Sequence, residues 1–581
     1  MKWTSRFYRN RQAYRLIVQR TVLPVVLGVS FFMPVAAQPS RTGGSSGWQI
    51  TPRVSVGATY SDNIKLAPAN AAEDDLVLEV EPGVSVRKQG GRLDLRLDYT
   101  LQGLLYANHG DANTVNHQLQ TFGSAEIFQK HFFLDAYGAI AQVPTTSSGR
   151  SDSAGSAVMG GLPTGLAFLS NLDLGLPGSA GLFRSFGASD KIAITDNQVT
   201  GYRYGISPYW RQDIGGWVEG LLRYRYDGVR YDDQNEGTTT QQGEQQTVNA
   251  DSQINTLTLD LKSGRRFNRI NWNINYLYKN QQLDQVTTGS NTTDSGEDRR
   301  EHFDAKITYR LSRYWSLLAN AGYEDSQVTG FENAQDGSYW GLGAIWSPNR
   351  FLEVAGLYGP DVNLIALRWN PSTRTYLDVR RRDRNVGVES GVNWQGTFKH
   401  QARASTWSVT YVDEVTNEQQ LLGSSLLAVG ADGQPLALTG QDPTVSTEGL
   451  LGVTNRNFRR KRLDAGVVYR RGPTGISVNA FNEERETQNA QSIESTYGAG
   501  ALWTWRFAPR IASFIGGGWE RDDLGEQAQR NDYWVSTVGL AQAFAPNFGG
   551  LISYRYYQND AGSAEREFRE NRLNVRFNMK F

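Results

Sequence analysis

Hydrophobic and polar side chains alternate with a period of two along much of this chain. The last eleven residues, "NRLNVRFNMKF", illustrate the pattern, because every second residue is apolar and the residues between are arginine, asparagine or lysine. A period of two is the period of a β-strand, in which successive side chains point to opposite faces. The apolar face of this predicted strand carries Leu573, Val575, Phe577, Met579 and Phe581.

The same alternation predicts further strands, and most of them place full charges on one face. Clear examples are residues 92–102, 218–227, 256–262 and 270–278. An antiparallel strand in a soluble sandwich has one apolar and one polar face as well, so alternation alone does not decide which face points inward.

The connections between these segments are of two kinds that roughly alternate. Tight turns include "RFNR" at Arg266, "RLSR" at Arg310 and "RFAPR" at Arg506. Short turns on one side and long loops on the other are typical of an up-and-down barrel in the outer membrane, with turns in the periplasm and loops outside the cell. We therefore predict an all-β fold, one closed antiparallel transmembrane β-barrel of about 24 strands, within a range of roughly 20 to 26. The long polar stretches are residues 61–75, 141–200, 228–253, 280–301, 414–460 and 482–494.

Tryptophan and tyrosine gather near the predicted strand ends. Rings at such positions form girdles at the two interfaces of a membrane-spanning barrel. The alternative for any one of them is a platform on which a sugar stacks. The residues are Trp48, Tyr60, Trp210, Trp217, Tyr314, Trp315, Trp340, Trp346, Trp503, Trp505, Tyr533 and Trp534.

The N-terminal region has the features of a secretory signal peptide. A basic stretch is followed by the uncharged "TVLPVVLGVSFFMPVAA", which ends in small residues. We predict residues 1–37 as a signal peptide cleaved after Ala37, 38–47 as a short linker and 48–581 as the barrel, located in the outer membrane of a Gram-negative cell. The alternative is an uncleaved membrane anchor.

Composition argues against most enzyme classes. The chain has no cysteine, which excludes thiolate catalysis and a disulfide framework. Its formal net charge of zero shows no excess of basic residues of the kind that binds nucleic acid. The five histidines lack the spacing of a zinc helix or of a Ser-His-Asp arrangement. We expect no catalytic, cofactor or metal site, and therefore no enzyme.

The remaining candidate site is the lumen. The run "DVRRRDR" from Asp378 to Arg384 has two interpretations, a positive patch for acidic sugars or an exposed loop rim that meets lipopolysaccharide phosphates or water. Alternation assigns the following pore-lining candidates to the inside: Glu79, Asp94, Arg96, Asp98, Glu219, Arg223, Arg225, Asp260, Lys262, Arg380, Arg572 and Arg576.

Several stretches resemble one family. "ITPRVSVGATYSDNIKLAP", "DDLVLEVEPGVSVRKQGGRLDLRLDYTL", "GISPYWRQDIG", "YWGLGAIWSPNRFLEVAGLYGP", "LIALRWNPSTRTYLDVRRRD" and "STWSVTYVDEVTNEQQ" are similar to the PEP-CTERM-system-associated outer-membrane proteins. The last strand, with Phe577, Met579 and Phe581, resembles the signal read by the barrel-assembly machinery. The resemblance covers most of the chain from Trp48, but residues 141–200 do not fit it.

The resemblance implies a role in exopolysaccharide export, with periplasmic export components as partners beside lipid, lipopolysaccharide and the assembly machinery. It does not exclude two alternatives. The barrel could be a general or solute-specific porin in which residues 141–200 fold inward as a constriction. It could also be a structural or surface-interaction barrel whose lumen is closed by salt bridges.

Overall fold

The computed structural model describes residues 47–144, 192–194, 198–231, 251–283, 286–288, 291–293, 297–328, 335–417, 457–486, 493–523, 530–561 and 567–581. Residues 46–580 form one compact unit. The predicted signal peptide, residues 1–37, and all but the last residue of the predicted linker lie outside the described residues.

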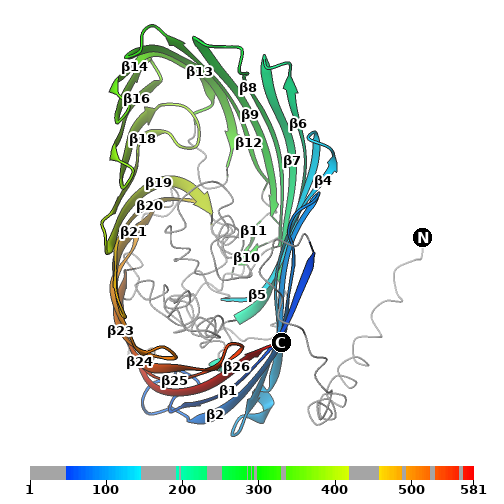
Figure 1. Cartoon of the computed structure of the whole chain (residues 1–581), viewed down its shortest axis with the longest axis vertical. Coiled ribbons are helices and arrows are strands. Elements are labelled where there is room, and N and C mark those ends of the chain that lie inside the picture. Colours follow the sequence, from blue (N-terminus) through cyan, green and yellow to red (C-terminus); the bar gives the residue numbers. More distant parts are fainter. Residues whose placement is uncertain are drawn as a thin grey trace, which may run out of the picture. The chain divides into compact units, whose positions relative to one another are not determined.

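The described chain forms one antiparallel sheet of 24 strands that closes on itself. Each strand pairs with its neighbours in chain order, and the sheet closes where β1 pairs with β26, from Arg53 opposite Lys580 to Ser61 opposite Arg572 (Figure 1). The prediction of a closed up-and-down barrel of about 24 strands is confirmed.

The first half of the sheet comprises β1 (Trp48–Ser61), β2 (Asp75–Lys88), β3 (Leu93–Tyr106), β4 (Thr114–Phe128), β5 (Phe132–Pro144), β6 (Gln198–Ile214), β7 (Val218–Tyr231), β8 (Ser252–Ser263), β9 (Ile270–Leu283), β12 (Glu297–Arg310), β13 (Trp315–Gln327) and β14 (Gly337–Asn349).

The second half comprises β15 (Leu352–Tyr358), β16 (Val362–Ser372), β17 (Thr375–Arg384), β18 (Gly391–Gln401), β19 (Ser405–Asn417), β20 (Asn457–Arg471), β21 (Thr474–Glu486), β22 (Ile493–Ala508), β23 (Ile511–Asp523), β24 (Asn531–Ala545), β25 (Phe548–Ala561) and β26 (Phe568–Lys580).

Two small elements lie outside this sheet. The strands β10 (Val286–Thr288) and β11 (Asn291–Thr293) pair only with each other, and η1 (Gly110–Ala112) is a single 3-10 turn between β3 and β4. No helix in the described part of the chain has the length and hydropathy of a membrane span.

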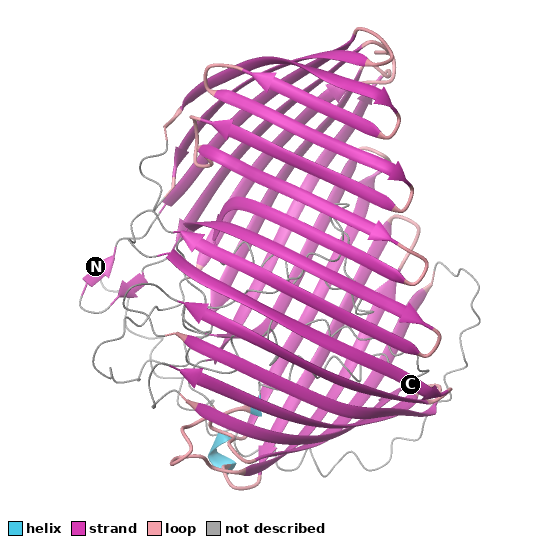
Figure 2. Cartoon of the chain, turned by 90° about the vertical axis from the view of Figure 1, so that its left-hand side faces the viewer, coloured by secondary structure: helices cyan, strands magenta, loops and turns pink. Residues whose placement is uncertain are grey.

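The tight turns gather along one rim of the barrel, which we call the turn rim; the opposite rim is the loop rim (Figure 2). The turn between β6 and β7 shows how such a connection is made. Its residues Gly215 and Gly216 have φ angles of +58° and +76°, a left-handed conformation that glycine adopts without steric cost. The strand β1 begins and β26 ends at the turn rim, so alternating short and long connections return the chain to one side.

The outer face of the barrel is apolar. In β14, Trp340 and Leu342 point outward with 53% and 61% of their surface exposed, whereas their neighbour Tyr339 points inward and is 4% exposed. A broad apolar belt is unfavourable in contact with water and favourable in contact with lipid hydrocarbon. Within hydrocarbon, only a closed sheet satisfies the hydrogen bonds of all its backbone groups. The outward faces therefore indicate an outer-membrane barrel.

Exposed aromatic residues lie at both ends of this belt. On β13, Trp315 is near the turn rim and Tyr323 near the loop rim, with 47% and 45% exposed. Eight residues of strand are about 26 Å long, or about 20 Å of height at the usual tilt, which matches the apolar band of such barrels. The girdle prediction is wrong for Tyr533, which is fully buried. It lies one position from the outward-facing Trp534 on β24 and therefore faces inward.

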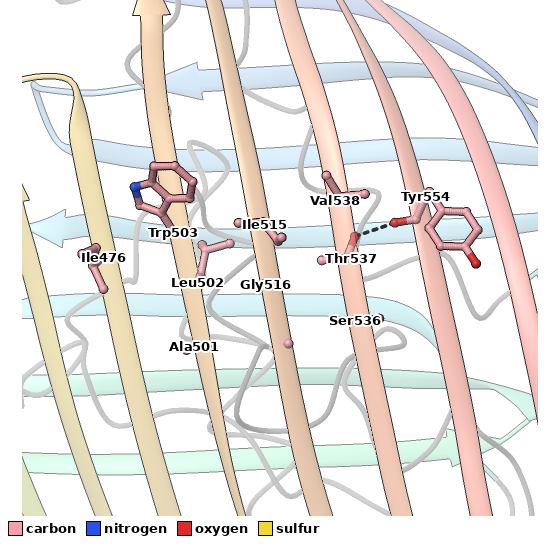
Figure 3. A pocket seen from close by; sticks show the side chains of 11 residues that line it. Ile476, Ala501, Leu502, Trp503, Ile515, Gly516, Ser536, Thr537, Val538 and Tyr554 are labelled. Carbon is pink, nitrogen blue, oxygen red and sulfur yellow. Dashed lines mark hydrogen bonds between the residues drawn. The ribbon is translucent and has the colours of Figure 1, made fainter.

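A hollow of about 520 Å³ interrupts the outer face where β22 to β25 run side by side (Figure 3). Its floor is a row of small residues, since Ala501 pairs with Gly517 and Gly517 with Ser536. Trp503 and Ile515 stand beside it with exposed side chains. The hollow therefore opens toward lipid and does not belong to the lumen.

Candidate functional site: the lumen of the barrel

The inner face of the barrel carries the charges. Strand parity places all twelve predicted pore-lining residues on this face, opposite to the exposed apolar side chains of the same strands. Four of them are buried within the wall, namely Glu79, Asp98, Arg572 and Arg576. The others are partly exposed toward the lumen: Asp94, Arg96, Glu219, Arg223, Arg225, Asp260, Lys262 and Arg380.

The inner faces of β26, β1, β2 and β3 form what we call the seam wall, because the barrel closes there. The guanidinium of Arg576 on β26 donates to Glu79 and, at 2.7 Å, to Glu81, both on β2. It reaches them by passing over Gly57 of β1, which lies opposite Arg576 on one side and Glu79 on the other. A Cβ at Gly57 would lie 3.6 Å from both groups. The amide of Gln102 on β3 also donates to Glu79.

A second arginine repeats this arrangement one strand further along. Arg53 of β1 lies opposite Gly83 of β2 and passes over it to Asp98 of β3, with Nη1 donating to Oδ2 at 3.0 Å. The hydroxyl of Ser85 donates to the same carboxylate at 2.6 Å. Here the fit is tighter, because a Cβ at Gly83 would come within 2.9 Å of the carbonyl oxygen of Tyr99. Arg53 is a lumenal residue that the sequence analysis missed.

A short loop between β17 and β18, residues 385–390, is tied to the inner face of β13; we call it the inner loop. Glu324 of β13 accepts hydrogen bonds from Arg384 at 2.7 Å and from the backbone N–H of Val388 at 3.2 Å. Val388 is 6% exposed. Gly387 has a φ of +87°, and any Cβ there would collide with the Glu324 carboxyl group. The buried Glu324 carboxylate, the pairing of Glu389 with Arg382 and a backbone hydrogen bond from Gly387 to Gln335 thus hold the inner loop against the wall.

The run "DVRRRDR" lies in β17, so the interpretation that it is part of an exposed loop is wrong. Alternation divides it between the two faces. Three inward arginines each have an acidic partner: Arg380 with Asp378 at 3.0 Å, Arg382 with Glu389, and Arg384 with Glu324. The outward Arg381 pairs with Asp383 at 3.3 Å. The run therefore does not form a patch of uncompensated positive charge.

Another buried carboxylate organises the wall at β20 and β21. Glu483 lies within 2.9 Å of Arg460 and Arg462 and within 2.6 Å of Arg485. The guanidinium of Arg462 also lies 4.7 Å from the ring centre of Phe481. Since arginines and carboxylates alternate across these contacts, most of the wall is polar without a strong field of one sign.

The described part of the long insertion contacts the inner wall near the loop rim. Ile192 is 1% exposed and packs against Val77 of β2 and Leu104 of β3. Its carbonyl accepts a hydrogen bond from the Tyr106 hydroxyl at 2.9 Å, and the N–H of Ile194 donates to the carbonyl of Ile64 at 3.0 Å. These three residues are therefore packed on the inner wall at the loop rim, and the prediction that residues 141–200 form a constriction stays a prediction.

One histidine is held between acids at the loop rim. His109 contacts Asp75 at 2.8 Å through Nδ1 and Glu73 at 2.7 Å through Nε2. The hydrogen bonds to Asp75 and then to Glu73 raise the pKa of His109, and those from Lys65 and then His109 lower the pKa of Glu73. Among the described residues, no group of three or more such side chains has the arrangement of a metal site.

Neither a protein-family model nor a curated protein matches this chain. Among solved structures, it is similar to the siderophore receptor PirA from Acinetobacter baumannii, with 10% identity over 91% of this chain and 80% of that one, at a TM-score of 0.43. The ferric enterobactin receptor PfeA from Pseudomonas aeruginosa gives 10% identity, coverages of 92% and 81%, and a TM-score of 0.45. The FrpB iron transporter from Neisseria meningitidis gives 11% identity over 92% of this chain and 82% of that one, at a TM-score of 0.44. At these values the likeness assigns no ligand and no partner to this chain.

Proposed function

We propose that this protein is a non-enzymatic passage for a hydrophilic polymer, an exopolysaccharide, across the outer membrane. One observation carries the proposal: a closed 24-strand barrel encloses an inner wall whose buried and half-buried side chains are charged and mostly paired. Such a wall is wetted by water and has little selectivity for small ions of one sign. The nature of the polymer rests on the resemblance to the PEP-CTERM-associated proteins. Periplasmic components that dock at the turn rim supply the polymer.

The decisive experiment locates exopolysaccharide in a strain that lacks this protein. We expect polymer to disappear from the surface and to accumulate in the periplasm or remain unmade, and the intact gene to restore it. Normal surface polymer in the deletion strain would remove the export role.

A labelled cysteine tests whether the lumen is the route. The chain has no cysteine of its own, so a single one can be labelled selectively. Thr410 of β19 points inward and its neighbour Val409 points outward with 37% exposed. We expect Thr410→Cys, but not Val409→Cys, to react with a bulky water-soluble thiol reagent and to lose export after labelling. Equal labelling of both would contradict a wet lumen.

A second candidate function is a solute-specific porin or a plugged barrel, and the inner loop favours it. Residues 385–390 and 192–194 both contact inward-facing side chains of the wall. Replacing Glu324 by Gln removes the charge that holds Arg384 at the start of the inner loop and weakens the acceptor of the Val388 N–H, so we expect the inner loop to detach more often and the ion current through purified protein in planar bilayers to rise. Arg381→Gln, on the outer face of the same strand as Arg384, is the matched control. Steady wild-type current indicates a porin, and no current in either protein indicates a plugged scaffold.

A further inference from the structure

The inner faces of β5, β6 and β7 differ from the seam wall in how their arginines are paired. Four arginines lie there, Arg203 and Arg211 on β6 and Arg223 and Arg225 on β7, and we call them the arginine strip. The acids among them are Asp135 and Asp227. Nearby acids are engaged elsewhere: Glu219 with Lys262 at 3.0 Å, Asp213 with Arg265 at 3.6 Å, and Asp260 with the amide of Asn275. With Asp213 and Glu219 of the same inner faces paired to Arg265 and Lys262, the four arginines of the strip share only the two acids Asp135 and Asp227 within the described ranges.

Aromatic rings orient these guanidinium groups. Arg223 lies 4.3 Å from the ring centre of Tyr209, and the other neighbour of that ring is Phe133, stacked at 5.0 Å with an interplanar angle of 11°. Arg225 lies 5.6 Å from the ring centre of Tyr137 and donates to its hydroxyl at 3.3 Å. Planar guanidinium groups that pack on rings lose less freedom when they bind a further partner.

Arg225 already donates to Asp227 at 2.9 Å, so the spare donors of the strip belong mainly to Arg223 and Arg211. The side chains of Arg223 and Arg225 are 38% and 40% exposed, whereas Arg576 in the seam wall is 1% exposed. Arg223 approaches Asp135 only to 3.7 Å, and its Nε has no hydrogen-bond partner. The hydroxyl of Ser207, on β6 beside them, is buried without a partner as well. Arg211 forms no ion pair with any residue in the described ranges.

From these contacts we infer that the arginine strip binds the carboxylate groups of an acidic polysaccharide, one built from uronic-acid units. This inference rests on the proposed function, since it names the class of polymer that the passage carries. A guanidinium donates two parallel hydrogen bonds to a carboxylate, and Arg223 and Arg225 lie about 7 Å apart on one face of a strand. The hydroxyls of Thr256 and Thr258 on β8, opposite Arg225 and Arg223, are placed to meet sugar hydroxyls.

Binding to purified, full-length barrel in detergent tests the inference. The probes are an oligogalacturonate and a neutral maltooligosaccharide of equal length. We expect the acidic probe to bind at least tenfold more tightly at low salt, and its affinity to fall as salt rises. Arg223→Gln combined with Arg225→Gln should abolish this preference, with the neutral probe unaffected.

Two further variants make the test independent of folding defects. Arg211→Gln removes an arginine without an ion pair in the described ranges and should weaken acidic binding about threefold in a correctly folded barrel. Arg380→Gln is the matched control, because that lumenal arginine is 51% exposed but already paired with Asp378, and we expect less than a twofold change. Folding is checked by the heat-dependent shift in gel migration.

The outcomes separate this inference from the proposed function. Equal binding of both probes, a double variant that binds like wild type, or an equal loss in Arg380→Gln would each overturn the inference. If the acidic probe binds as expected while the deletion strain still exports polymer, the strip is a ligand site and the export role fails. If export depends on the barrel but acidic binding is absent, the polymer is not recognised here.

Discussion

Two parts of the inner wall carry the same side chains and use them differently. In the seam wall, Arg576 binds two acids and Arg53 binds one, each passes over a glycine of the neighbouring strand, and their side chains are only 1% and 14% exposed. On β5 to β7, Arg223 and Arg225 lie against rings and keep much of their surface exposed to the lumen. The first arrangement links three adjacent strands, and the second leaves hydrogen-bond donors for a ligand.

The difference teaches that lumenal charge is not by itself evidence of a binding site. A buried ion pair costs desolvation and is retained where it fixes strand register, which suits the place where the first strand meets the last. A half-exposed arginine with spare donors contributes little to stability. The following variants test this division, from the largest expected effect to the smallest.

Removing Arg576 should have the largest effect. Arg576→Ala leaves Glu79 and Glu81 buried close together without their cation, and we expect the free energy of unfolding to fall by about 3–5 kcal/mol. Arg223→Ala, which loses a 3.7 Å approach to Asp135, should cost less than about 1 kcal/mol. Denaturant unfolding in lipid vesicles, followed by tryptophan fluorescence, measures both. Equal costs would erase the distinction between the two walls.

The outer face of the same last strand gives the next effect. Val575→Asp places a charge in hydrocarbon near the middle of β26, and we expect a loss of about 2 kcal/mol and a lower yield of inserted protein. Asn574→Asp, one position along and on the lumenal side, is the matched control; it loses an amide hydrogen bond to Thr59 and should cost about 1 kcal/mol or less. Similar yields of the two variants would contradict our assignment of faces.

The sequence sufficed for the barrel because its signal is repetitive. Alternation in segments such as residues 270–278 recurs in strand after strand, so a local error does not change the architecture. The girdle prediction failed at Tyr533, since position near a strand end alone fits either a girdle or the inner wall. Parity distinguishes them only once the register relative to Trp534 is known.

The pairing of lumenal charges could not be predicted. Arg576 and Glu79 are 497 positions apart in the chain, and their contact depends on the closure of the barrel. Gly57 and Gly83, which allow arginines to pass over a strand, cannot be distinguished from other glycines in the sequence. "DVRRRDR" was open to misinterpretation because a run of charges resembles a loop, whereas in β17 each inward arginine has an acidic partner, and the partners of Arg382 and Arg384 lie outside the run.

The two glycines of the seam wall predict a smaller, unequal pair of effects. A Cβ at Gly57 has ordinary contacts, with the nearest atom at 3.5 Å, so Gly57→Ala should change stability by less than about 1 kcal/mol. At Gly83 the Tyr99 carbonyl at 2.9 Å and Arg53 Nε at 3.0 Å must move, and Gly83→Ala should cost about 1–3 kcal/mol. The same unfolding measurement compares them, and a reversed order would show that Arg53 does not lie over Gly83.

The smallest effect is local and concerns His109, where the loops above the seam wall meet. Its raised pKa means that protonated His109 stabilises the contact between the two loops. That stabilisation is fully present below the ordinary histidine pKa of about 6.5 and is lost as pH rises through the raised value. Hydrogen exchange of residues 107–113, corrected for intrinsic rates, should therefore be slower at acidic than at alkaline pH. His109→Gln should remove this pH dependence and leave exchange in β1 and β26 unchanged, because the ion pairs that close the barrel lie below the loops and do not depend on this proton.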